Sequence, residues 1–367
     1  MNGVSYVNLS AQWCDEQEKL LPLISATLKS GQYVGSTEVD DLEKEIESAI
    51  GVDNVVALNS GTDALFFGLL ASGVRSGDEV ITPPNSFVAS TAAIVHLGAK
   101  PIFVDVGSDQ NIDPNLIEAA ITRKTKAIMP VHLTGRVADM RQIQDIACRH
   151  GITVIEDAAQ AIGSCFEGRT SGSWGKVGCF SAHPLKNLNA CGDAGFITTN
   201  DIGIADRVRL MRNHGMVDRD TVEEFGYVSR MDSIQATILR FRLSTLSRVI
   251  KYRQGNVALY RSILNPDVVF HPPDRSMEFN TWHTFVIQVD RRDELRTFLA
   301  SRKIETAIHY PVPIHLQPAG RSLGYKKGDY PITEAQAERI LSLPVHQYLQ
   351  EDQVRFVAET INEFYES

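Results

Sequence analysis

The sequence predicts an α/β fold, in which a large domain with a mostly parallel, seven-stranded sheet covered by helices precedes a small α+β C-terminal domain. Seven short apolar runs alternate with helix-like stretches over the first two thirds of the chain. Strands that are apolar on both faces are typical of a parallel sheet covered on both sides. The chain of 367 residues is also long for a single core, which favours two domains.

The expected strands are short apolar segments that end at loops. They are residues 55–58, 79–82, 101–106, 127–131, 153–155, 177–180 and 195–198. Helices that would cover the sheet are expected at 62–72, 89–97, 115–120, 140–149 and 204–212. Ligands of such sheets bind beyond the carboxyl ends of the strands, so the loops there are the places to look for chemistry.

Helical periodicity also marks the two ends of the chain. Residues 15–30 predict an amphipathic helix, and a second helix is expected to end at Gly51. Asp232 is the expected N-cap of a long helix that leaves the large domain. Beyond it, strands are expected at 284–289 and 305–309, and helices at 293–301, 333–341 and 351–364. The chain is accordingly divided into an N-terminal arm (1–35), a large domain (36–240) and a small domain (241–367).

Composition argues against several classes of function. The formal net charge is −9 and no block of basic residues offsets it, so nucleic acid is not an expected partner. No apolar run approaches the roughly 18 residues that span a bilayer, and the polar start lacks a signal-peptide core. A cytoplasmic protein without membrane contact is therefore expected. The five cysteines are scattered without a Cys-x-x-Cys pair, which predicts neither a disulfide framework nor a metal site.

A lysine stands in an irregular turn between the last two expected strands of the sheet. Lys186 lies in the segment from Ser181 to Leu188, and Gly192 to Gly195 lead into the next strand. Most lysines of a soluble protein are surface charges, so this residue carries little weight alone. Its presentation from a rigid turn at a strand end makes it a candidate catalytic group.

Two segments offer donors for an anion. Gly61 and Thr62 follow a strand and begin a helix, where free backbone N–H groups bind a phosphate well. An ordinary N-cap is the alternative interpretation of this segment. Ser181, five residues before the lysine, is a second candidate donor.

Two other loops add an aromatic ring and a carboxylate. Phe87 follows the strand 79–82 and could stack on a planar ligand, although such a ring belongs more often to the core. Asp157 ends a buried strand, where an ionised carboxylate needs a cationic partner. That partner is either a ligand or a neighbouring arginine or lysine.

Together the four features match one cofactor, pyridoxal 5′-phosphate (PLP). Lys186 would form a Schiff base with the cofactor aldehyde and, once displaced by an incoming amine, move a proton between Cα and C4′. Asp157 would keep the pyridine nitrogen protonated, and Gln160 would hydrogen-bond the ring hydroxyl.

Six motifs, spread over almost the whole chain, carry a family resemblance. They are Asn59 to Leu65, Pro130 to Gly135, Ile155 to Gln160, His183 to Leu188, Arg212 to Gly215 and Ser229 to Ala236. They resemble those of the DegT/DnrJ/StrS family of sugar aminotransferases. The resemblance implies a PLP-dependent transferase of fold type I, a homodimer with active sites at the subunit interface. It also implies transfer of an amino group, usually from glutamate, to a keto-sugar, with Thr62 and Ser181 on the phosphate and Phe87 against the ring.

The resemblance extends to substrate contacts, with one departure. Members of the family usually have a Gly-x-Asn-x-Arg segment, whose asparagine reaches the cofactor phosphate of the partner subunit. This chain has Val228 at the position of that asparagine. Arg230, the last residue of the segment, stays a candidate contact for an anionic part of the sugar. The segment 307–313 resembles members that aminate C3 of a nucleotide-linked sugar. His309 and Tyr310 could donate hydrogen bonds there, or else cap and pack a proline-rich loop.

The expected reaction is therefore amination of a nucleotide-linked 3-keto-hexose by an amino acid. Amination at C4 of a nucleotide-linked 4-keto-6-deoxy sugar, or of a keto-sugar phosphate, stays open. A nucleotide-sugar dehydrogenase or epimerase would need a Gly-x-Gly-x-x-Gly at the start of the sheet, which is absent. A regulatory protein on the same fold would be expected to lack Lys186 or Asp157, and both are present.

Overall fold

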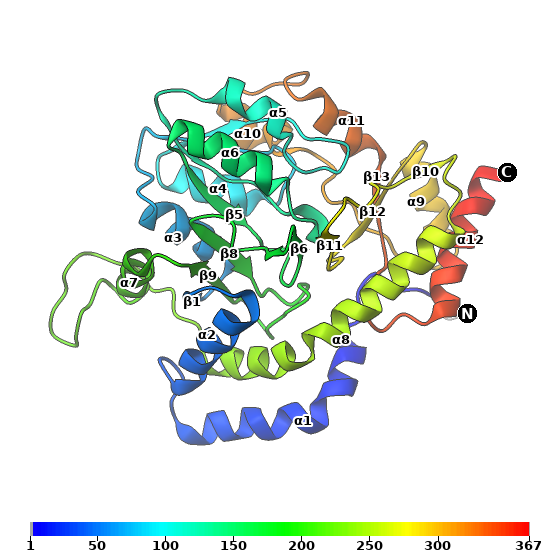
Figure 1. Ribbon diagram of the computed structural model, residues 1–367. Coiled ribbons are helices and arrows are strands. Elements are labelled where there is room, and N and C mark those ends of the chain that lie inside the picture. The colour runs from blue at the N-terminus through cyan, green and yellow to red at the C-terminus, as the bar shows by residue number, and fades with distance from the viewer. Residues whose placement is uncertain (1–2, 367) are drawn as a thin grey trace.

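A seven-stranded sheet forms the centre of the larger part of the molecule (Figure 1). The computed structural model describes residues 3–366. In spatial order the strands are β1 (Asn54–Leu58), β9 (Gly195–Thr199), β8 (Val177–Ser181), β5 (Thr153–Asp157), β4 (Thr125–Ile128), β2 (Glu79–Thr82) and β3 (Lys100–Phe103). Only β9 runs antiparallel to its neighbours. All seven expected strands are confirmed, although β3 and β4 end three residues earlier than expected.

Helices bury both faces of this sheet, because successive residues of a strand point to opposite sides. Val56 packs in a core with α3, α4 and α7, whereas its neighbour Val55 packs on the other face with α2 and α8. The helices of this part are α2 (Thr37–Ile50), α3 (Gly61–Ala71), α4 (Val88–His96), α5 (Pro114–Ile117), α6 (Met140–His150) and α7 (Ile202–Met211). Each of them was expected, and a 3₁₀ turn follows α5.

Two long helices lie below the sheet and lead toward the C-terminal part (Figure 1). α1 (Leu9–Ser30) begins earlier than expected, because the Asn8 side chain caps it by accepting a hydrogen bond from the Ala11 N–H at 2.9 Å. α8 (Ser233–Ile263) buries Leu239 beneath the sheet and Tyr260 in the core of the C-terminal part. The division at residues 35 and 240 stays a prediction.

The C-terminal part is a three-stranded antiparallel sheet packed on helices. Its strands are β10 (Val269–Phe270), β12 (Phe285–Val289) and β13 (Ile340–Leu343), and its helices are α9 (Arg292–Ser301), α11 (Pro331–Arg339) and α12 (Glu351–Glu366). The short helix α10 (Pro318–Ser322) packs on the 3₁₀ turn Ile314–Leu316, whose first N–H donates to the Pro84 carbonyl of the larger part at 3.0 Å. A further small sheet joins β6 (Cys165–Phe166), β7 (Arg169–Thr170) and β11 (Glu278–Phe279), strands too short to give a sequence pattern.

Two expectations for this part were wrong. Residues 305–309 form no strand and only a single bridge from Ala307 to Ser342, since Pro311 and Pro313 follow closely and cannot donate to a ladder. The helix expected at 333–341 ends at Arg339. Ile340 to Leu343 are fully or almost fully buried and pair with β12 instead, because their apolar side chains belong to the core.

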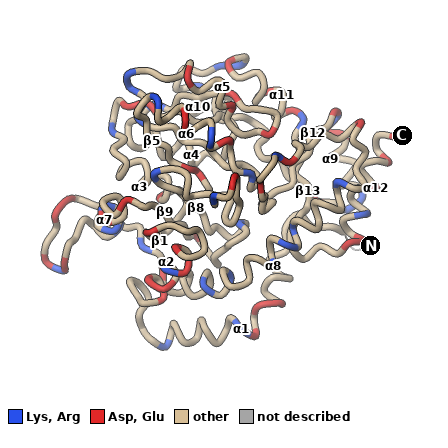
Figure 2. Tube along the Cα trace, in the orientation of Figure 1, with Lys and Arg blue, Asp and Glu red and all other residues tan. Residues whose placement is uncertain are grey.

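Residues 3–366 contain neither a membrane-spanning helix nor a metal-binding group of side chains. No helix in this range is both long and apolar enough to cross a bilayer. No group of three or more His, Cys, Asp or Glu side chains in the same range could hold a metal ion. Acidic and basic residues are interspersed over both parts of the molecule (Figure 2).

Candidate active site

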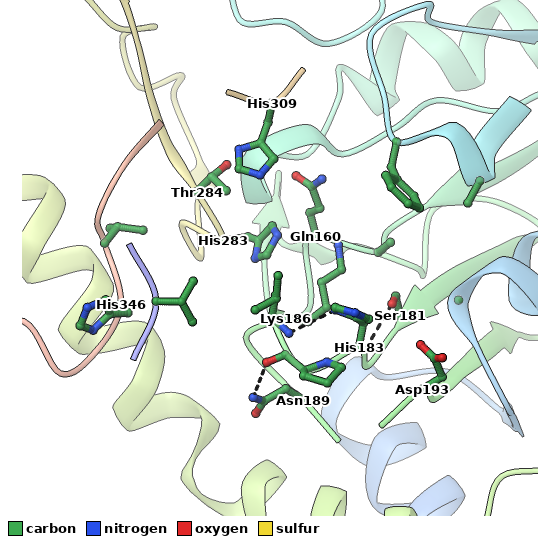
Figure 3. A pocket seen from close by; sticks show the side chains of 18 of the residues that line it. Gln160, Ser181, His183, Lys186, Asn189, Asp193, His283, Thr284, His309 and His346 are labelled. Atoms are coloured by element: carbon green, nitrogen blue, oxygen red, sulfur yellow. Dashed lines mark hydrogen bonds between the residues drawn. The ribbon is translucent and has the colours of Figure 1, made fainter. Parts of the chain in front are cut away.

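A cavity of about 410 Å³ lies at the carboxyl ends of β5 and β8, between the two parts of the molecule. Nine of the ten residues expected at a site line it: Gly61, Thr62, Phe87, Asp157, Gln160, Ser181, Lys186, His309 and Tyr310. Figure 3 shows Gln160, Lys186 and His309 directed into the same space. The tenth, Arg230, does not line it. Its side chain is exposed and donates to Asn213 Oδ1 at 3.2 Å.

One end of the cavity is a cradle of hydrogen-bond donors. α3 begins there, and Ser60 caps it by accepting from the Asp63 N–H at 3.1 Å, so the N-cap interpretation is also correct. A Cβ atom on Gly61 would lie 2.5 Å from the Ser181 Cβ. Glycine therefore lets the helix start lie against the end of β8. The first turn of α3, with Thr62, and Ser181 at the end of β8 thus line the same end of the cavity, where N–H groups and hydroxyls suit a phosphate.

Asp157 is 4% exposed and has only neutral partners. Its carboxylate accepts from Ser90 Oγ at 2.6 Å and from the Ala159 N–H at 3.2 Å. No lysine or arginine within residues 3–366 forms an ion pair with it, so the salt-bridge alternative is wrong. Burial raises the pKa of this carboxyl, and a cation on a ligand would favour its ionised form.

The neighbouring carboxylate, Glu156, faces away from the cavity because strand residues alternate. It accepts hydrogen bonds from the N–H groups of Gly172, Trp174 and Gly175 at 2.6–2.8 Å. His132 lies 2.8 Å from it through Nε2, while its Nδ1 accepts from the Ala138 N–H. This buried network fixes the end of β5, and with it the direction of Asp157.

Lys186 lies in a turn closed by its own N–H, which donates to the His183 carbonyl at 2.8 Å. Burial lowers the pKa of the Lys186 amine to about 8, and the nearby Asp157 carboxylate opposes that shift. At pH 7 about a tenth of the amine is therefore unprotonated, far more than for an ordinary lysine, and both a nucleophile and a proton acceptor require that form.

Gln160 and Tyr310 form one side of the cavity together. The Gln160 Oε1 accepts from the Thr134 N–H at 2.7 Å, and its amide nitrogen lies 3.4 Å from the Tyr310 hydroxyl. The amide nitrogen is the donor in the contact with Tyr310, so one of its two N–H groups stays without a partner among residues 3–366. Phe87 lies 6.1 Å from the Tyr310 ring. His309 lies 2.8 Å from the Ser342 Oγ, and burial lowers its pKa to about 4.

Several residues that line the cavity were not expected from the sequence. They include Tyr6, Gln12, Asn189, Arg253, His283 and His346. Burial keeps the pKa of His283 well below its usual range, so the imidazole is neutral. No local pattern marks these positions, since they come from segments far apart in the chain.

The arrangement fits PLP. Donors for a phosphate lie at one end, and the carboxylate of Asp157 forms no ion pair. Phe87, Gln160 and the amine of Lys186 line the same cavity. These groups match the phosphate, the ring nitrogen, the ring face, the ring hydroxyl and the aldehyde of that cofactor.

Comparison with known proteins agrees with the geometry. A model of the DegT/DnrJ/EryC1/StrS aminotransferase family matches residues 14–362. A protein from Geobacillus stearothermophilus named "pleiotropic regulatory protein" is 40% identical over 99% of both chains. The dTDP-3-amino-3,4,6-trideoxy-alpha-D-glucose transaminase of Streptomyces venezuelae is 38% identical, over 99% of this chain and 96% of its own.

Solved structures share the whole fold. The crystal structure of S. venezuelae DesV in complex with a ketimine intermediate covers 100% of both chains, with a TM-score of 0.97 and 37% identity. Other similar structures hold PLP or its amino form, PMP.

Proposed function

The chain belongs to the DegT/DnrJ/EryC1/StrS family of PLP-dependent sugar aminotransferases, and we propose that it aminates C3 of a nucleotide-linked keto-hexose with L-glutamate as donor. The observation that carries the proposal is the meeting of Lys186, Asp157 without an ion-pair partner, and the phosphate cradle in one cavity. The name of the Streptomyces relative, a 3-amino-sugar transaminase acting on a dTDP-sugar, supports C3 and a nucleotide.

Each residue has a part in the chemistry. Bound PLP supplies an aldehyde that accepts the amino group and a ring that withdraws electrons from Cα. Lys186 would hold that aldehyde and, as a free amine, would move a proton between Cα of the amino acid and C4′ of the cofactor. Asp157 would hold a proton on the ring nitrogen, and Thr62 and Ser181 would hold the phosphate. The residues Gln160, His309 and Tyr310 orient the ring and the sugar.

A regulatory role is not proposed, although one relative carries a regulatory name. Lys186 and Asp157 are both present and both line the cavity, which a purely regulatory protein would not need. No observation favours C4 amination or a keto-sugar phosphate. The cytoplasmic location stays a prediction.

A homodimer with shared sites is part of the proposal. The loop between α7 and α8 extends away from the body of the molecule (Figure 1). It carries Arg230 and the apolar Phe225 and Val228, which are 97% and 54% exposed. Apolar side chains this exposed favour burial in an interface. A second copy that covers them would bring Arg230 to the partner's cavity.

The function is tested with purified protein and PLP. The loaded protein is expected to absorb near roughly 410–430 nm and to lose that band with L-glutamate. A panel of dTDP- and UDP-linked sugars, aminated at C3 or at C4, is then tried in the reverse direction, and the 3-amino sugars should react fastest. A Lys186→Ala variant should neither show the band nor turn over. Turnover by that variant, or faster reaction of the 4-amino sugars, contradicts the proposal.

A further inference from the structure

One buried arginine differs from the others in its partners. Four arginines are buried within residues 3–366: Arg136, Arg242, Arg253 and Arg292. Three of them form ion pairs, namely Arg136 with Glu278, Arg242 with Glu16, and Arg292 with Asp293. Arg253, which is 8% exposed, forms none with any residue in this range. It is also the only one of the four that lines the cavity.

The partners of Arg253 are all neutral. Its Nη1 donates to the carbonyls of Trp282 and His283 at 3.2 and 3.0 Å, and its Nη2 donates to Gln347 Oε1 at 3.3 Å. Its Nε has no partner among the described residues. Burial lowers the pKa of this guanidinium to about 10, which leaves it charged at neutral pH. A buried cation with neutral partners only is costly, and a carboxylate is the anion that its planar fork fits best.

The neighbouring side chains do not supply a charge either. Burial raises the pKa of Tyr6, and it lowers the pKa values of His283 and His346, so all three are neutral near pH 7. The carboxylates that line the cavity, Asp157 and Asp193, form no ion pair with Arg253. This wall of the cavity therefore carries one net positive charge.

We propose that Arg253, with Gln347 beside it, forms a binding subsite for a carboxylate of the amino-acid donor. The inference rests on the proposed function, because an amino donor must enter the cavity that holds Lys186 and Arg253. Every α-amino acid brings a carboxylate two bonds from its reacting nitrogen, whereas a neutral keto-sugar brings none. An acidic sugar is the second source of the same chemistry, and the test separates the two.

The test uses two variants of Arg253 and one control. Arg253→Gln removes the charge, and Arg253→Lys keeps the charge but loses the planar fork. Lys251→Gln removes an exposed cation two residues earlier on the same helix, outside the cavity. The PLP-loaded proteins are titrated with L-glutamate. Binding of succinate, a carboxylate without an amine, and of UDP-glucuronate, an acidic nucleotide sugar, is measured by calorimetry. The cofactor band of each variant reports correct folding.

We expect Arg253→Gln to weaken both L-glutamate and succinate by about tenfold to a hundredfold, as loss of a charged hydrogen bond predicts. Arg253→Lys should weaken them less, Lys251→Gln should not, and the affinity for UDP-glucuronate should stay the same. A loss confined to UDP-glucuronate would assign the subsite to the sugar and overturn the donor assignment. Unchanged affinities for all three ligands would overturn the subsite. If wild-type protein binds succinate through Arg253 but never reacts with L-glutamate, the proposed function fails instead.

Discussion

Gln12 on α1 and Asn189 in the lysine turn, the segment from Ser181 to Asn189 that presents Lys186, exchange two hydrogen bonds of 3.0 Å each, although they lie 177 positions apart in the chain. Asn189 also donates to the Pro184 carbonyl at 2.7 Å, inside the turn that presents Lys186. Glu16 accepts from Gln12 and pairs with Arg242 on α8. The lysine turn is thus held between the first helix and the long helix that links the two parts of the molecule.

Asn189→Ala should therefore loosen the turn without removing a group that the chemistry needs. We expect kcat to fall by about tenfold, while the KM for L-glutamate changes little, because misplacement of a catalytic group costs rate more than binding. Steady-state kinetics and the absorbance of the bound cofactor measure the effect. Gln12→Ala should reproduce it more weakly, since the bond to Pro184 survives. A variant with unchanged kcat would show that Asn189 is only a packing residue.

The sheet and the place of Asp157 at the end of a buried strand could be predicted from the sequence, since short apolar runs are local patterns. The start of α1 was not predicted, because it depends on the side-chain cap of Asn8 and not on apolar periodicity. The first residues of β13 were assigned to a helix, because their apolar side chains continue the helical pattern of the segment before them. Gln12, Asn189 and Arg253 could not be found, because their partners are distant in sequence and only the tertiary fold brings them together.

The pKa of Lys186 gives the protein a pH dependence in cofactor binding. Only the unprotonated amine attacks an aldehyde, and burial lowers this pKa from 10.5 to about 8. The rate at which cofactor-free protein takes up PLP should therefore rise with pH and level off above about pH 8. Stopped-flow absorbance between pH 6 and about 10 measures it. A rate that still rises steeply between about pH 9 and 10 would show an ordinary, exposed lysine.

Asp157→Asn tests the carboxylate in the cavity. The amide keeps the size of the side chain and can still accept from Ser90, but it cannot hold a proton on the ring nitrogen. We expect kcat to drop by at least about a hundredfold, on the scale of a lost acid–base group, while the cofactor still binds. Glu156→Gln, on the opposite side of the strand, should instead lower the melting temperature, because Glu156 organises backbone N–H groups. Equal kinetic losses in the two variants would contradict these separate roles.

Gly61→Ala tests the close approach at the phosphate cradle. The added Cβ would lie 2.5 Å from the Ser181 Cβ, and neither group can rotate away, so the helix start must shift. We expect a loss of about 1–3 kcal/mol in the free energy of unfolding and weaker binding of PLP. Gly255→Ala is the matched control. Its Cβ would meet no atom within 4 Å on the exposed face of α8, and it should stabilise the protein by about 0.5–1 kcal/mol. Tight PLP binding by Gly61→Ala would place the phosphate elsewhere.

Complementation tests whether Arg230 serves the cavity of a second copy. Lys186→Ala and Arg230→Ala subunits are each expected to be nearly inactive as homodimers. In a mixed dimer one of the two cavities has its own Lys186 and the partner's Arg230, and is therefore complete. Because about half of the dimers are mixed when equal amounts are co-expressed, about a quarter of wild-type activity should return. Co-expression of Lys186→Ala with Asp157→Asn is the control, because both residues line the cavity of one chain and no mixed dimer regains a complete site. If Arg230 acts within its own chain, every mixed cavity lacks either Lys186 or Arg230. The first pair would then stay as inactive as the control.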